Sequence, residues 1–219
     1  MNRNSIIALI VLVAALGIGA YMYLGAGEEA AQGAPSEETS AAALLDVPEM
    51  TLGDADAPVK VIEYASFTCP HCGAFHEDSF DKLKADYIDT GKVQFTFREV
   101  YFDRFGLWAS MIARCGGEEK FYGLTGLIMK GQQDWLGDGD PNNISAALRK
   151  IALVAGLTEE QTDACLNDDL QAQSLLFWFQ ENADVHAIRS TPSFVVGDEL
   201  IAGNNYAKVK AAIDAQLGE

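Results

Sequence analysis

The most informative part of this chain is residues 59–72, VKVIEYASFTCPHC, in which a short apolar run leads directly into two cysteines. Val59–Ala65 is rich in β-branched residues and is preceded by a proline, a pattern that is typical of a buried strand. Pro70 suits the first position of a helix, because its missing N–H would be unpaired there in any case. We therefore predict a strand-to-helix turn that carries Cys69 and Cys72.

The segments that follow this turn complete a β-α-β unit. Apolar residues recur at helical spacing from Cys72 to Tyr87, and Gly91 suits the end of a helix. Residues 93–100, VQFTFREV, then alternate between apolar and polar side chains, which predicts a second strand. The two cysteines consequently lie at the turn between the first strand and the helix.

The rest of the chain is predicted to be helical from about residue 104 to residue 184, and then to form a β-hairpin and a final helix. Thr158 and Gln161 have the spacing of a capping box that starts one of these helices. The other expected helices cover residues 107–115, 118–129, 144–155, 170–182 and 206–217, and the hairpin strands cover 193–196 and 200–202. This order predicts an α/β protein with a thioredoxin fold and an inserted helical domain.

Residues 6–24 contain no charged side chain and are long enough to cross a bilayer as a helix. Arg3 precedes this run and Glu28 and Glu29 follow it, so the positive-inside rule leaves the N-terminus in the cytoplasm and exports the rest. The length of the run favours an uncleaved transmembrane anchor over residues 1–24, because a cleaved signal segment usually has a shorter apolar core. The folded body is exported in both cases.

Residues 25–47 are small, acidic and aperiodic, and they are predicted to form a flexible linker before a folded domain at 48–219. The whole chain has 15 Lys and Arg residues against 32 Asp and Glu residues, a formal net charge of -17. No basic stripe reverses this sign locally, so nucleic acid is not an expected partner.

Two cysteines separated by two residues can close a small disulfide at the start of a helix. A thiolate is the reacting species, and the N-terminus of a helix stabilises it through free N–H groups and a partial positive charge. We expect Cys69 to be exposed and to be attacked by incoming thiolates, and Cys72 to be its covered partner. His71 favours the Cys69 thiolate further when it is protonated, and a stabilised thiolate makes the disulfide a better oxidant.

A zinc site is the alternative reading of this motif, since His76 follows Cys72 by four residues. No second CxxC or HxxxH is present to complete such a site, so redox chemistry is favoured and no metal or cofactor is expected. His76 is then interpreted as a partly buried helix residue near the site. Cys115 and Cys165 are expected to pair as a structural disulfide in an oxidising compartment, the alternative being two free buried thiols.

Residues 63–72, EYASFTCPHC, followed by Phe75-His76, resemble the DsbA-like oxidoreductases of bacterial envelopes. Residues 191–196, TPSFVV, resemble the second signature of that family, and the match extends from about residue 50 to residue 217. The resemblance implies a cis bond at Thr191-Pro192 that faces the disulfide, with the Thr191 backbone free to pair with a substrate peptide. An ordinary trans proline at the entry to a strand is the alternative.

The same resemblance implies that Glu63 is an acidic residue buried beneath the redox pair, where it could move the proton of Cys72 or tune the pair. The competing interpretation is a strand residue that simply reaches solvent. The site residues predicted from the motif and the resemblance together are Cys69, Pro70, His71, Cys72, Glu63, Thr191 and Pro192.

The family resemblance also implies a function and a location. It implies a protein of the bacterial periplasm or cell envelope, tethered to the inner membrane by its N-terminal segment or released as a soluble form by cleavage. There it would donate disulfides to unfolded, cysteine-containing exported proteins, and a quinone-linked membrane partner would reoxidise it.

Thr191 departs from the valine found in the best-known oxidases of this family, and it resembles the residue found in isomerases and in some other DsbA-like branches. A reductase or isomerase that a different membrane donor keeps reduced is therefore the alternative function. A metal-binding or chaperone module without turnover is the third.

Overall fold

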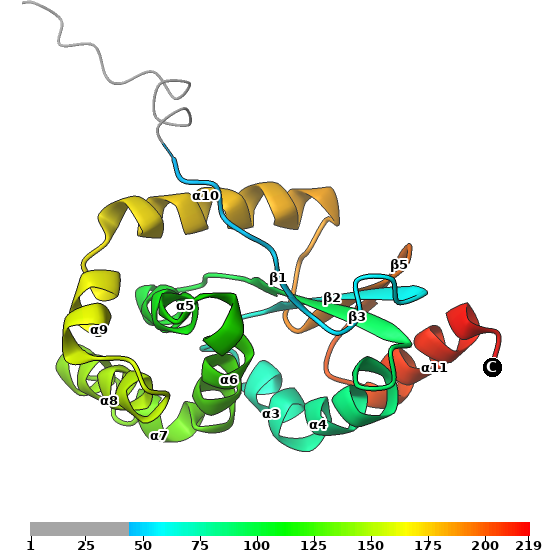
Figure 1. Cartoon of the computed structure of the whole chain (residues 1–219), viewed down its shortest axis with the longest axis horizontal. Coiled ribbons are helices and arrows are strands. Elements are labelled where there is room, and N and C mark those ends of the chain that lie inside the picture. The colour runs from blue at the N-terminus through cyan, green and yellow to red at the C-terminus, as the bar shows by residue number, and fades with distance from the viewer. Residues whose placement is uncertain (1–43) are drawn as a thin grey trace, which may run out of the picture. The chain divides into compact units, whose positions relative to one another are not determined.

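The computed structural model describes residues 44–219, and Figure 1 shows the course of the chain. The predicted anchor at 1–24 and most of the predicted linker lie outside the described residues. Within 44–219, every helix is too short or too polar to span a bilayer.

The centre of the domain is a five-stranded sheet with the strand order β1-β3-β2-β4-β5. The strands are β1 (Met50–Leu52), β2 (Val59–Ala65), β3 (Val93–Glu99), β4 (Ser193–Val196) and β5 (Glu199–Ala202). β2 and β3 are parallel, as the predicted β-α-β unit requires, whereas the other neighbouring pairs are antiparallel.

Helices cover both sides of this sheet, with α10 on one side and α3, α4 and α11 on the other (Figure 1). Three helical elements connect β2 to β3, namely α3 (Pro70–Asp78), α4 (Phe80–Leu83) and the π-helical turn η1 (Lys84–Ile88), and α11 (Tyr206–Leu217) follows β5. The inserted helices are α5 (Arg104–Cys115), α6 (Gly117–Lys130), α7 (Gln132–Leu136), α8 (Pro141–Val154), α9 (Glu159–Leu166) and α10 (Asp169–Val185). The predicted α/β thioredoxin fold with a helical insertion is therefore confirmed.

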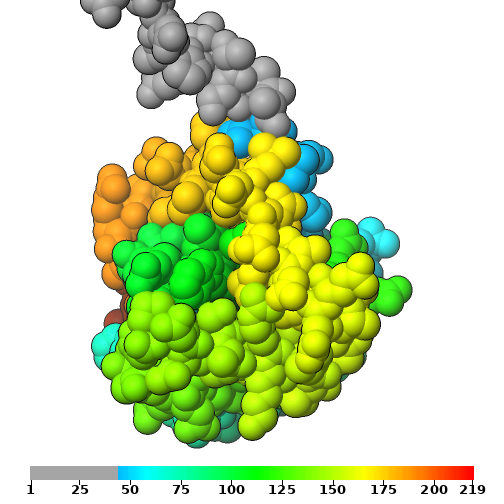
Figure 2. Space-filling view, turned by 90° about the vertical axis from the view of Figure 1, so that its left-hand side faces the viewer, coloured from blue at the N-terminus to red at the C-terminus, as the bar shows by residue number. Residues whose placement is uncertain are grey.

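The insertion folds as a group of helices between β3 and β4, and its outer side forms one continuous surface (Figure 2). Thr158 and Gln161 make both hydrogen bonds of the capping box at the start of α9. Asp103 and Asp140 are the N-cap residues of α5 and α8. Each side chain accepts hydrogen bonds from two backbone N–H groups of its helix, without the reciprocal bond of a capping box.

The alternation of side chains along β2 assigns its residues to two different cores. Val61 and Ala65 belong to the large core, which also contains Phe75 of α3. Tyr64 belongs to a smaller core on the α10 side of the sheet. Because successive residues of a strand point to opposite faces, Glu63 lies on the α3 side.

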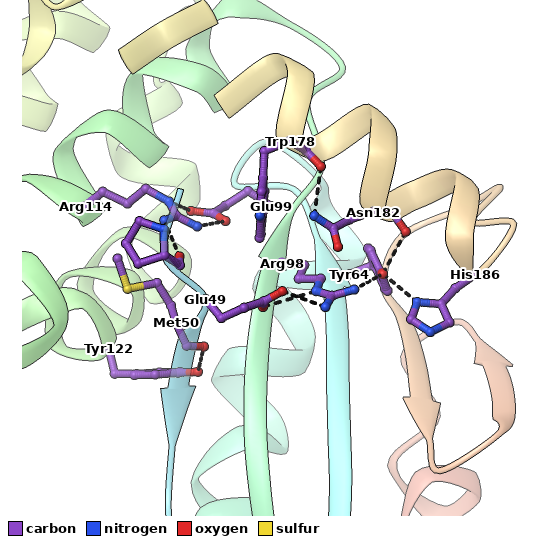
Figure 3. A network of polar contacts seen from close by, with 11 residues as sticks. Glu49, Met50, Tyr64, Arg98, Glu99, Arg114, Tyr122, Trp178, Asn182 and His186 are labelled. Carbon is purple, nitrogen blue, oxygen red and sulfur yellow. Dashed lines mark hydrogen bonds and ion pairs between the residues drawn. The ribbon is translucent and has the colours of Figure 1, made fainter. Parts of the chain in front are cut away.

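Polar contacts attach α10 and the first described residues to the sheet (Figure 3). The Tyr64 hydroxyl accepts a hydrogen bond from Arg98 (2.7 Å) and donates to the backbone carbonyl of Asn182 (2.9 Å). The same oxygen lies 2.6 Å from Nδ1 of His186, and Arg98 also pairs with Glu49 at 2.6 Å. Since α10 leads into the loop before β4, these contacts fix where that loop begins.

The structure corrects the prediction of one continuous helix between Cys72 and Gly91. Ser79 has a φ of -131°, so α3 ends there and α4 begins at Phe80. Serine competes for backbone hydrogen bonds and is a weaker helix former than straight-chain residues. Two short elements, β1 and α7, were not predicted, because three and five residues are too few to show a period.

Candidate redox site

The two cysteines of the CPHC motif lie at the start of α3, as expected for a strand-to-helix turn. Cys69 is the N-cap residue, Pro70 occupies the first turn, and the Cys72 N–H donates to the Cys69 carbonyl at 3.0 Å. Cys69 is 9% exposed and Cys72 is fully buried. Cys69 is therefore less exposed than the sequence predicts, although it is the more accessible member of the pair.

The surroundings of Cys69 lower the pKa of its thiol from 9.0 to about 5. The largest cause is a hydrogen bond from the Cys72 thiol, and burial opposes it. The Thr191 side chain and the backbone N–H groups of Cys72 and His71 lower the pKa further. These N–H groups are the free donors of a helix N-terminus, so the expected stabilisation of the thiolate has a structural basis.

The pKa of Cys72 is raised, so the two thiols of the motif have opposite acid–base properties. Burial is the largest cause, followed by the hydrogen bond that this thiol makes to Cys69 and by the negative charge of Glu63. A thiolate on Cys69 beside a protonated Cys72 is consequently the favoured arrangement of the reduced pair.

Thr191 and Pro192 reach the redox pair from a distant part of the chain. The Thr191–Pro192 peptide bond is cis, and the Thr191 carbonyl oxygen lies 3.4 Å from Sγ of Cys69. Pro192 is buried and leads directly into β4, which pairs with β2. The loop before β4 thus forms one wall of the site.

Glu63 and His76 are both buried beneath the redox pair. Their side chains are 0% and 1% exposed, and Oε2 of Glu63 lies 2.9 Å from Nε2 of His76. The interpretation of Glu63 as a strand residue that reaches solvent is therefore wrong, and its side chain is buried. The expectation of a partly buried His76 is wrong, because Phe80 of α4 covers its ring at a centroid distance of 4.7 Å.

His71 is exposed on the first turn of α3. Its backbone N–H is one of the groups that lower the pKa of Cys69. The contribution visible in the structure thus comes from the main chain of His71.

Gln132 of α7 is a site residue that the sequence did not reveal. Its side chain is buried, and its Nε2 donates to the carbonyls of Phe67 (2.8 Å) and Cys69 (2.9 Å). A Cβ on Gly73 would lie only 2.9 Å from Oε1 of Gln132, so glycine permits this close approach. No local pattern marks a single glutamine that acts on a loop more than sixty residues away.

A polar cavity of about 270 Å³ lies beside the start of α3, between that helix and the junction of α6 with α7. Pro70, Gly73 and Glu77 line it on the side of the redox helix, and Lys130 and Gln132 line it on the side of the insertion.

Cys115 and Cys165 form a disulfide that joins the end of α5 to α9, with a Cα–Cα distance of 5.8 Å. Cys69 and Cys72 are thus the free cysteines among residues 44–219.

Within the same residues, no three histidine, cysteine, aspartate or glutamate side chains lie close enough together to hold a metal ion.

Comparisons with known proteins agree with this geometry. A thioredoxin family model matches residues 46–215. The chain is 33% identical over 176 residues to a putative protein-disulfide oxidoreductase of Rickettsia bellii, covering 80% of this chain and 67% of that protein. It is 28% identical to disulfide bond formation protein D of Bacillus subtilis, covering 76% of both chains. Two further Rickettsia relatives are covered over 62% and 63% of their length, so this chain spans about two thirds of these relatives.

The fold is also similar to that of a solved structure. The crystal structure of alpha-DsbA1 from Wolbachia pipientis superposes with a TM-score of 0.71 and 27% sequence identity. The superposition covers 82% of this chain and 96% of that one.

Proposed function

Because this chain belongs to the DsbA-like thiol–disulfide oxidoreductases of the thioredoxin family, we propose that it donates disulfides to exported proteins. The observation that carries this direction is the low pKa of Cys69, at about 5. A stabilised thiolate stabilises the reduced form, and the disulfide then accepts electrons more readily. The acidity of Cys69 therefore supports oxidation of substrates over their reduction.

In the proposed reaction, a substrate thiolate attacks Sγ of Cys69 in the oxidised protein. The Cys69–Cys72 bond breaks, its electron pair goes to Cys72, and a mixed disulfide joins Cys69 to the substrate. A second substrate thiolate then attacks the substrate sulfur of the mixed disulfide. Cys69 leaves as a thiolate, the substrate gains a disulfide, and the protein has taken up two electrons.

We assign substrate binding to Thr191 and Pro192. The Thr191 carbonyl lies 3.4 Å from Sγ of Cys69, so a peptide held on the Thr191 backbone would have its cysteine next to the attacked sulfur. Pairing of an extended peptide with exposed backbone groups is a recurrent mode of recognition that depends little on sequence. Such binding suits an enzyme that acts on many unfolded chains.

The proposed partners follow from the same chemistry. The substrates are cysteine-containing proteins exported to the bacterial envelope, and a quinone-linked membrane oxidase restores the disulfide after each turnover. Attachment of this chain to the inner membrane through residues 6–24 stays a prediction from the sequence.

A disulfide reductase or isomerase is the second candidate, and Thr191 is the feature that favours it. It favours this candidate through the family resemblance alone, because its side chain lowers the pKa of Cys69 and that effect by itself supports oxidation. The two candidates share every residue of the site and differ in the redox state that the cell maintains.

The test is to equilibrate the purified domain with glutathione buffers and to trap the redox state of Cys69 in growing cells. We expect a disulfide clearly more oxidising than that of thioredoxin, and a CPHC motif that is mostly oxidised in cells. A motif that is mostly reduced in cells would instead support the reductase or isomerase.

A further inference from the structure

Arg104 and Arg189 are exposed residues on two segments that border the redox pair, and they form no ion pair within residues 44–219. The other arginines of these residues, Arg98, Arg114 and Arg149, each pair with a carboxylate. The chain has 32 Asp and Glu residues against 15 Lys and Arg residues, so acidic partners are abundant. An arginine that stays unpaired in such a domain is available to a carboxylate of another molecule.

Arg104 lies at the start of α5, next to the turn that carries the reactive cysteine. The hydroxyl of Thr68, the residue before Cys69, donates to Oδ2 of Asp103 at 2.7 Å. Oδ1 of Asp103 accepts two backbone N–H groups of α5, so both oxygens of this carboxylate already have partners. Arg104 therefore follows directly after a residue that is bonded to the redox turn.

Aromatic rings hold the guanidinium group of Arg104. Its central carbon lies 4.9 Å from the ring centroid of Phe105 and 5.6 Å from that of Trp108. Attraction to a ring face restrains the side chain and leaves its N–H donors available for a carboxylate. Because Arg104 is exposed, a carboxylate from solvent can reach these donors and form two parallel hydrogen bonds with them.

Arg189 lies on the other segment that borders Cys69, the loop before β4. It precedes Thr191 by two residues, a span of about 7 Å when extended, and the Thr191 carbonyl lies 3.4 Å from Sγ of Cys69. A peptide held on the Thr191 backbone would therefore run past Arg189. Because residues of neighbouring extended segments face each other, a side chain about two positions from the cysteine of the peptide would lie next to Arg189.

We infer that Arg104 and Arg189 select substrates in which acidic residues flank the reacting cysteine. This inference rests on the proposed function and names the chemical class of its substrates. A carboxylate of the substrate gains from either arginine a partner of opposite charge, and such pairs across extended chains are favourable. The arginines bind the substrate and leave the steps of the thiol–disulfide exchange as described above.

The overall charge of the chain predicts the opposite preference. With a formal net charge of -17, the protein attracts basic peptides and repels acidic ones over long distances. The two arginines act on residues close to the cysteine, where the Coulomb energy between two charges is largest. A preference for acidic peptides would therefore come from the arginines, and a preference for basic peptides from the general field of the protein.

The test uses the oxidised full-length protein and three dithiol peptides that differ only in the residue two positions from each cysteine, which is Glu, Gln or Lys. The measurement is the second-order rate constant for oxidation of each peptide at neutral pH, followed by acid quenching and mass spectrometry. A salt concentration of about 0.1 M screens the general field beyond about 10 Å. Each rate constant is divided by that of the same peptide with hydroxyethyl disulfide, an uncharged reagent, because a neighbouring charge also changes the pKa of a peptide thiol.

The variants are Arg104→Gln, Arg189→Gln and the double variant. Lys208→Gln is the matched control, because it also removes one positive charge from an exposed residue that forms no ion pair within the described domain. Lys208 belongs to α11, which lies at the other end of the domain from α5 (Figure 1). The control therefore changes the net charge by the same amount without touching either segment at the redox pair.

We expect the wild-type protein to oxidise the Glu peptide about tenfold faster than the Lys peptide. Each single variant should reduce this preference about threefold, the double variant should lose it, and Lys208→Gln should keep it. Equal rates for the three peptides, a preference for the Lys peptide, or a double variant that keeps the wild-type preference would overturn the inference and leave the proposed function intact. A wild-type protein that oxidises none of the peptides would overturn the proposed function itself.

Discussion

Replacing Cys72 with alanine in the reduced protein should raise the pKa of Cys69, since the hydrogen bond from Cys72 is the largest cause of its value of about 5. A thiol with that pKa is about 99% ionised at pH 7, whereas one with the ordinary value of 9.0 is about 1% ionised. The Thr191 side chain and the N–H groups at the start of α3 still act in the variant. We therefore expect a pKa at least one unit above that of the wild type, which is a tenfold fall in the ratio of thiolate to thiol.

The matched control is Cys72→Ser, because serine keeps a donor at the same position. The ultraviolet absorbance of the thiolate, followed from pH 3 to pH 10, gives the pKa of Cys69 in each variant, and the rate of alkylation by iodoacetamide gives an independent measure. The serine variant should titrate nearer to the wild type than the alanine variant does. If both variants titrate near pH 5, the donor at position 72 is not what makes Cys69 acidic, and the reasoning is wrong.

The remaining predictions concern stability. The lowered pKa of Cys69 stabilises the folded reduced protein fully above pH 9 and loses its effect as the pH falls through about 5. Urea unfolding should therefore show the reduced form gaining up to about 3 kcal/mol over the oxidised form between pH 4 and pH 7, and parallel pH curves for the two forms would contradict this. Gln132→Leu should cost about 1–3 kcal/mol, because it leaves the buried Phe67 carbonyl without its donor, while the Cys69 carbonyl keeps the N–H groups of Cys72 and Gly73; the exposed neighbour variant Gln133→Leu should cost less than about 0.5 kcal/mol. Replacing both Cys115 and Cys165 with alanine should lower the free energy of unfolding by about 2–4 kcal/mol and leave the titration of Cys69 unchanged, and a shifted titration would show that the disulfide acts on the site.

The parts of the fold that could be predicted are those in which the pattern is local. β2 and β3 show their periods within seven residues each, and the capping box of α9 lies within four. The acidity of Cys69 is also partly local, since the N–H groups of His71 and Cys72 belong to the same helix turn. The position of Thr191 next to Cys69 came from the family resemblance, because no local rule brings together residues that are 122 positions apart.

The features that were missed depend on contacts between distant segments. His76 is buried because α3 ends at Ser79, which places Phe80 over its ring. This burial was missed because the sequence pattern favoured one continuous helix. Gln132 reaches Cys69 from 63 residues away, through a helix too short to be recognised. β1 is a strand only because β3 offers it an edge to pair with.

The two hydrogen bonds of Gln132 have a consequence for engineering and for the evolution of the helical insertion. An insertion between two strands is usually regarded as a module that can be exchanged between relatives. Here one of its side chains supplies donors to the carbonyls on either side of Thr68, immediately before the redox helix. A chimera that received another helical insertion would have to present a donor at the same point, or the turn that holds its reactive sulfur would lose two of its attachments.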